Sequence, residues 1–164
     1  MTGDVTLGAL ARANKYSLPI GSQLGAIANA SYSQASSTTF ATVGGLKFPF
    51  VPVGSYIFDL YLATTNNGTG GLKLALNTDT SLTTSLFLAD TWVYNTTTLT
   101  GEANQTTFGS SLIAAAIAAT AVFAGGTLIV NKPGSLILQA AQDVSNGTAF
   151  TIANGSYITL NRVA

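Results

Sequence analysis

The chain has 164 residues, of which 47% are hydrophobic and only 7% charged, and its six basic and six acidic residues give no net charge. The basic residues are scattered and form no stripe that would neutralise phosphates, so we expect no nucleic-acid partner. Since the chain contains neither histidine nor cysteine, His-based triads, His–metal sites, disulfides and thiol chemistry are excluded.

The shortage of charge is the most informative feature of the composition. Soluble proteins carry about 25% charged residues, which form a coat that keeps them in solution. Either copies or partners cover much of this surface, or its many Thr and Asn residues solvate it. The longest apolar run, 112–124, is shorter than the ~20 residues of a membrane-spanning helix, and the N-terminus lacks the apolar core of a secretory signal. We therefore expect no membrane partner.

The first 35 residues differ from the rest of the chain. They are rich in Ala, Ser and Asn and carry isolated apolar side chains, which suit a segment that becomes ordered on a partner. We interpret residues 1–35 as an extended N-terminal arm and residues 36–164 as one domain. The apolar side chains that we expect to anchor the arm are Leu7, Leu10, Tyr16, Leu18 and Ile20.

From residue 38 the pattern becomes that of β-strands. The stretch 46–53 is aromatic and β-branched, but Pro49 and Pro52 predict an edge or irregular strand. In 56–63 large apolar residues alternate with a second set, so one face of the strand is strongly apolar. The turn-rich sequence TTNNGTGG follows, and then a second alternating strand over 72–77. This order predicts a β-hairpin.

Four further strands are predicted, separated by turn signals that include residues 95–102. They cover residues 86–94, 127–131, 135–142 and 156–163. Short strands at this spacing predict an all-β fold, an antiparallel β-sandwich or jelly roll. The segment 111–123 is Ala-rich, which favours helix, but its Ile, Val and Phe residues favour a buried strand pair, which we prefer in a mostly β chain.

No spacing of side chains indicates catalysis. The carboxylates fall in separate strands and turns, and none forms the converging pair that glycoside cleavage needs. We expect no enzyme activity, no metal and no cofactor. Aromatic side chains in the predicted strands could stack on sugars, but such residues more often lie in a core or a subunit interface. These aromatic residues are Phe48, Phe50, Tyr56, Tyr61, Trp92 and Tyr94.

An ordered set of motifs resembles a recurrent domain of tailed-phage virion proteins. The set is GSYIFDLYLA, GGLKLALN, DTWVYNTTTLTGEAN and GTLIVNKPGSLILQAAQDVSNGTAFTIANGSYITLNRV, and the resemblance covers residues 36–164. The same layout is similar to the trimeric jelly roll of tumour necrosis factor and of the globular heads of complement. The first 35 residues match no part of it.

The resemblance implies a homotrimer in which the GSYIF strand and the final GSYITL strand lie in one sheet beside the threefold axis. The positions that it assigns to the trimer interface are Tyr56, Phe58, Tyr61, Tyr157 and Thr159. A trimer would bury a second apolar face on each chain, which explains the missing charge without a membrane.

We therefore expect a capsid decoration, or cement, protein in the virion, bound to the outer surface of a phage head. As a homotrimer it would bridge subunits of the major capsid protein, with the arm as the clamp. The alternative is a receptor-binding or tail-fibre tip module, although no heptad or collagen repeat of a fibre shaft is present. A third interpretation, a sugar-binding module, predicts exposed aromatic side chains in a groove and a monomer.

Overall fold

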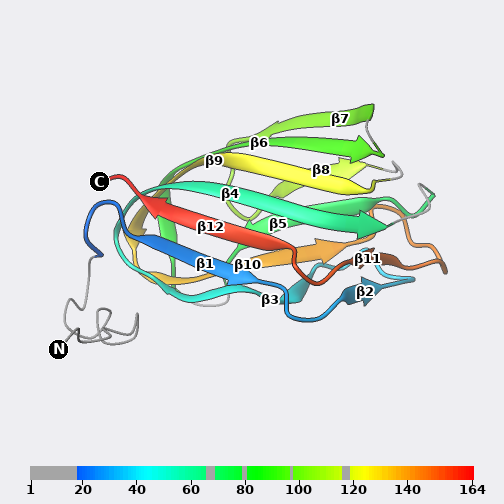
Figure 1. Cartoon of the computed structure of the whole chain (residues 1–164), viewed down its shortest axis with the longest axis horizontal. Coiled ribbons are helices and arrows are strands. Elements are labelled where there is room, and N and C mark those ends of the chain that lie inside the picture. The colour runs from blue at the N-terminus through cyan, green and yellow to red at the C-terminus, as the bar shows by residue number, and fades with distance from the viewer. Residues whose placement is uncertain (1–17, 66–68, 79–80, 97, 116–118) are drawn as a thin grey trace.

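The computed structural model describes residues 18–65, 69–78, 81–96, 98–115 and 119–164. These residues form β-strands and no helix, and the strands make two antiparallel sheets that pack as a sandwich (Figure 1). The first sheet contains β1 (Gln23–Ile27), β12 (Tyr157–Arg162), β4 (Gly54–Thr65), β9 (Ala121–Lys132), β6 (Thr83–Asn95) and β7 (Thr98–Gln105), in that spatial order. The short strands β2 (Tyr32–Gln34) and β11 (Phe150–Ile152) extend it beside the end of β4.

The second sheet has four strands and covers the back of the first. Its spatial order is β3 (Ala41–Val51), β10 (Gly134–Ala141), β5 (Leu72–Asn77) and β8 (Ser111–Ala115). From β3 to β10 the chain crosses between the sheets after almost every strand, with the β6–β7 pair as the exception. This connectivity is jelly-roll-like, and it confirms the predicted all-β antiparallel sandwich.

The core lies between the sheets and is built by the alternation of the strands. In β4, Tyr56, Phe58, Leu60 and Leu62 are all at most 2% exposed. They pack with residues of the second sheet such as Leu74, which is fully buried. The two-residue period of β4 therefore gives one face to the core and the other to the outside.

The predicted hairpin of residues 56–63 and 72–77 is wrong, although both segments are strands. β4 pairs with β12, β9 and β11, whereas β5 pairs with β10 and β8 in the other sheet. The segments are strongly apolar because they line the two opposite walls of one core. A local sequence pattern does not distinguish this crossing from a hairpin, since both need a turn between two alternating strands.

Three other predictions have clear outcomes. β3 is an edge strand with register shifts in its pairing with β10, as its prolines predicted. The Ala-rich segment forms strands, β8 and the start of β9, in its described part. The sequence analysis predicted a turn over residues 95–102. Residues 98–105 instead form β7, which pairs with β6.

Part of the segment assigned to the arm belongs to the sandwich. β1 pairs along its length with β12, and the backbone N–H of Gly21 donates to Arg162 O at 2.9 Å. The Arg162 guanidinium donates to Leu18 O. The described chain therefore begins at the end of the sandwich where the C-terminus lies (Figure 1).

Candidate functional site

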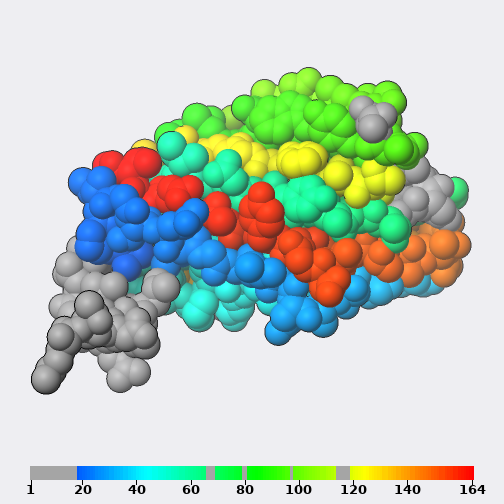
Figure 2. Space-filling model, in the orientation of Figure 1, coloured from blue at the N-terminus to red at the C-terminus, as the bar shows by residue number. Residues whose placement is uncertain are grey.

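The outer face of the eight-stranded sheet carries a row of large side chains that crosses five strands. In antiparallel pairs, residues directly opposite each other point to the same face. Ile27 lies opposite Tyr157, Tyr157 opposite Tyr61, Tyr61 opposite Phe123, and Phe123 opposite Trp92. This set is called the aromatic row below. Its strands β1, β12, β4, β9 and β6 run side by side across the face shown in Figure 2.

The rings of the aromatic row contact one another. The Tyr61 ring centroid lies 5.0 Å from that of Phe123 and 5.7 Å from that of Tyr157. Tyr94 lies two residues after Trp92 on β6, and its ring packs edge-on against that of Phe123 with the centroids 5.6 Å apart. Ring pairs at these separations stabilise one another, so the row is a preformed aromatic surface.

A polar row runs beside the aromatic row. Across β4, β9 and β6, the residues in register are Asp59, Gly125 and Asp90, with Thr159 opposite Asp59 on β12 and Asn104 opposite Asp90 on β7. Gly125 has no side chain, so the sheet surface is lowered between the two carboxylates.

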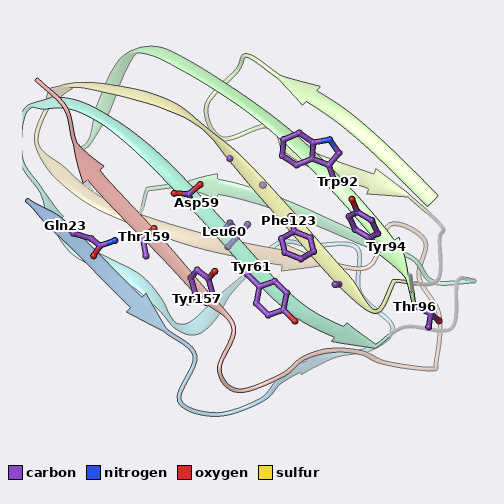
Figure 3. A pocket seen from close by; sticks show the side chains of 13 residues that line it. Gln23, Asp59, Leu60, Tyr61, Trp92, Tyr94, Thr96, Phe123, Tyr157 and Thr159 are labelled. Carbon is purple, nitrogen blue, oxygen red and sulfur yellow. The ribbon is translucent and has the colours of Figure 1, made fainter. Parts of the chain in front are cut away.

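Residues of both rows line a hollow of about 940 Å³: Tyr61, Trp92, Phe123 and Tyr157 from the aromatic row, and Asp59, Gly125 and Thr159 from the polar row. Figure 3 shows Tyr61, Tyr157, Phe123, Tyr94 and Trp92 around it, with Asp59 on its polar side. The hollow is open to solvent and combines aromatic with polar side chains, which suits a ligand that lies along the face of the sheet.

Large apolar side chains on the outer face near β1 are exposed to solvent. Ile27 is 63% exposed, Ile57 46% and Tyr157 41%. Large contiguous apolar patches on the surface of a soluble chain mark sites of interaction. Ile27, Tyr157 and Tyr61 follow one another across neighbouring strands and are called the apolar patch below. Ile57 lies on the same face, on the far side of Asp59.

The structure separates the five residues that the resemblance assigned to a trimer interface. Tyr61, Tyr157 and Thr159 lie together on the outer face and line the hollow. Tyr56 and Phe58 have no exposed surface and belong to the core, where they cannot contact another chain. The strand period gives the reason, since residues at even positions of β4 face inward and residues at odd positions face outward.

The residues assigned to the arm are also divided. Leu18 is 6% exposed and Ile20 is 73% exposed, so only the second presents a free apolar side chain. Leu7, Leu10 and Tyr16 lie outside the described residues. Of the aromatic residues considered for sugar stacking, Tyr56 and Phe48 are in the core, whereas Tyr61, Trp92 and Tyr94 line the hollow.

Phe123 and Gly125 are among the contributors to the hollow that the sequence analysis missed. Phe123 lies at the end of the Ala-rich segment, whose conformation was ambiguous, and Gly125 gives no signal of its own. An alternating reading of β9, with Val122 and Ala124 inward, would have placed both on the outer face.

The described residues contain no group of three or more acidic, Cys or His side chains that could hold a metal ion. Within the same residues, no helix has the length and apolar character to cross a membrane. Comparison of the sequence with protein families and with curated proteins finds no match.

Proposed function

We propose that the protein is a homotrimeric decoration protein of a tailed-phage capsid, bound to the outer surface of the head. The observation that carries this proposal is the apolar patch on the outer face of β1, β12 and β4. It lies on the sheet that, in the trimeric jelly rolls this chain resembles, faces the threefold axis. As that resemblance implies, β4 and β12 are direct neighbours.

A trimer explains why the chain is so poor in charge. If three copies pack through the apolar patch, each buries Ile27, Tyr157 and Tyr61 in addition to its own core. Interfaces of obligate oligomers are apolar and resemble a core cut in half. The burial of these side chains removes from water the surface that a charged coat would otherwise have to keep in solution.

The position of Leu18 supports a capsid-binding role for the residues that precede it. Leu18 is held at the C-terminal end of the sandwich by Arg162. With a threefold axis along the strands, three copies of Leu18 lie at the same end of the trimer. The three points at which residues 1–17 join the described chain therefore lie at one end of the trimer, and linked segments bind with greater avidity than one.

The mechanism is stabilisation of the assembled lattice by mass action. A trimer that binds neighbouring major capsid subunits in the mature shell, but not loose subunits, shifts the equilibrium toward the assembled shell. The shell then comes apart only after the trimer has been released.

The test is a deletion of residues 1–17, which spares β1; removing all of 1–35 would also remove β1 and β2 and weaken the sheet. We expect the full-length protein to scatter light as three copies of its 16.7 kDa chain. The shortened protein should also be a trimer, of correspondingly smaller mass, and should fail to attach to parent particles that lack the protein. Attachment of the shortened protein, or a monomer in the full-length protein, would contradict the proposal.

A receptor-binding module at the tail is the second candidate, favoured by the open aromatic hollow. Immunogold labelling of intact particles separates the two, since a decoration protein labels the head and a receptor-binding module labels the tail.

A further inference from the structure

We infer that the side of the hollow formed by β9 and β6 is a binding site for a neutral oligosaccharide. Three aromatic side chains, Trp92, Tyr94 and Phe123, form its wall. Gly125 and Asp59 form the floor and the polar side. The C–H faces of a sugar ring stack on aromatic rings, while its hydroxyl groups donate hydrogen bonds to carboxylates.

Gly125 makes room for the ligand. A Cβ placed on Gly125 would have Phe58 O at 3.6 Å and Asp59 Oδ1 at 3.7 Å as its nearest neighbours, which are ordinary contacts. The fold therefore does not need glycine at this position. Its effect is to leave a depression between Asp59 and Asp90, flanked by the aromatic wall.

The charges on this side exclude a second copy of the chain as the occupant. Asp90 lies across Gly125 from Asp59, and Glu102 lies opposite Trp92 on the same face. Of the described basic residues, Lys47 and Lys73 belong to the other sheet, and Lys132 and Arg162 end their strands. An identical face would bring three more carboxylates and no described cation in these rows, and burying unpaired charges is costly.

The same charges select the class of sugar. Three carboxylates repel uronic acids and other anionic saccharides, whereas a neutral sugar supplies the hydroxyl donors that carboxylates accept. The ligand is therefore an uncharged hexose or N-acetylhexosamine oligomer. The hollow adjoins the apolar patch through Tyr61 and Tyr157, but the proposed saccharide contacts are Trp92, Tyr94, Phe123 and Asp59, none of which the trimer proposal uses.

The experiment is isothermal titration calorimetry of the full-length protein with defined hexamers. The neutral probes are the β-1,4-linked hexamers of glucose, mannose and N-acetylglucosamine, and the anionic probe is hexagalacturonate. We expect at least one neutral hexamer to bind with a Kd below about 1 mM and hexagalacturonate to give no heat of binding. Absence of binding by all three neutral probes, or binding of hexagalacturonate alone, would overturn the inference.

Two variants locate the site. Gly125→Val places a branched side chain, which suits a strand, in the depression, and we expect it to abolish binding of the neutral hexamer. Gly44→Val is the matched control, because Gly44 lies on β3 in the other sheet and a Cβ there meets no atom within 4 Å. Equal binding by both variants would show that the saccharide does not bind in the depression at Gly125 and would contradict the proposed site.

A third variant tests the stacking contact. Trp92→Ala should weaken binding roughly tenfold, as expected for the loss of one stacked ring, and unchanged affinity would remove Trp92 from the site. Light scattering on each variant shows whether the trimer is intact, so failure of the saccharide site and failure of self-association are recorded separately.

Discussion

Tyr61 and Tyr157 lie directly opposite each other on the neighbouring strands β4 and β12, with ring centroids 5.7 Å apart. Both side chains point away from the core, and Tyr157 is 41% exposed. The pair forms the centre of the apolar patch, so a change at either position tests whether this face meets another copy.

Tyr157→Asp should split the trimer into monomers. If Tyr157 is buried between copies, the substitution places unpaired carboxylates in an apolar interface, and charges are buried only at a large cost. In the single chain the same position is partly exposed, so the monomer should remain folded. Multi-angle light scattering gives the mass, and far-ultraviolet circular dichroism gives the fold. Thr42→Asp, on the exposed part of β3, serves as the control, and a trimeric Tyr157→Asp protein would rule out the interface.

Phe58→Ala should be far more destabilising than Tyr61→Ala, although the two residues are three positions apart. Phe58 is fully buried and stacks on Phe87 at 5.9 Å, so its loss should lower the free energy of unfolding by about 3–5 kcal/mol. Tyr61 lies on the outer face, and its loss should cost about 1 kcal/mol from its ring contacts.

Urea unfolding at one fixed protein concentration measures both changes, because oligomer formation makes apparent stability depend on concentration. A larger loss for Tyr61→Ala than for Phe58→Ala, in samples that light scattering shows to have the same oligomeric state, would mean that Phe58 faces outward and Tyr61 inward.

Gly126→Ala should destabilise the fold, whereas Gly125→Ala should not. A Cβ on Gly126 would lie 1.9 Å from Leu88 O, so β6 and β9 would have to separate at the centre of the sheet. Forcing atoms into a packed region costs typically 1–3 kcal/mol. At Gly125 the nearest atoms are 3.6 Å away, and replacing glycine there reduces the entropy of the unfolded chain. Differential scanning calorimetry should show a lowered Tm for the first variant only; equal Tm values would contradict the close approach of these strands.

Tyr56→Phe should reduce the loss of stability at alkaline pH. Burial raises the pKa of Tyr56, and the nearby charge of Arg162 acts in the opposite direction. The unfolded phenol ionises near pH 10, so above that pH the unfolded chain binds fewer protons than the folded chain. The stability that the neutral phenol contributes is therefore complete below pH 10 and is lost as the pH rises through the folded-state pKa.

The variant should also be less stable near neutral pH by about 1 kcal/mol, because the Tyr56 hydroxyl donates to Pro52 O at 2.9 Å and that carbonyl would lose its donor. Urea titrations between pH 8 and about pH 11 compare the two proteins around the tyrosine pKa. Burial also raises the pKa of Tyr32, so the Tyr56→Phe protein should still lose some stability as the pH rises. Identical pH profiles would show that Tyr56 does not titrate differently in the folded state.

The fold class could be predicted from the sequence because alternation in strands such as β4 and β12 is a local property. The pairing partners could not, because they depend on which wall of the core each strand occupies. Leu74 and Phe58 are equally apolar and equally buried, yet they lie on opposite sheets. The same limit applies to β1. Its sequence has only a weak strand pattern, and it forms a strand because it pairs with the edge of β12.

The resemblance placed Tyr61 and Tyr157 on one surface, and both side chains lie on the outer face of the sheet. Tyr56 and Phe58 were assigned to that surface by a motif match, against the alternation of their own strand. Gly125 could not be recognised from the sequence, because it forms a depression only between Asp59 on β4 and Asp90 on β6.

Both ends of the described chain lie at one end of the sandwich, where Ser55 N donates to Ala164 O at 2.8 Å. A peptide fused after Ala164 would emerge beside Leu18 and would crowd any shell to which the N-terminal residues attach. The loop between β10 and β11 lies at the opposite end (Figure 1), where Gln142 Nε2 donates to Thr148 O at 2.8 Å. If the protein decorates a shell as proposed, an epitope for display should be inserted near Ser145, at the end of the sandwich opposite Leu18, and purification tags at the C-terminus should be cleavable.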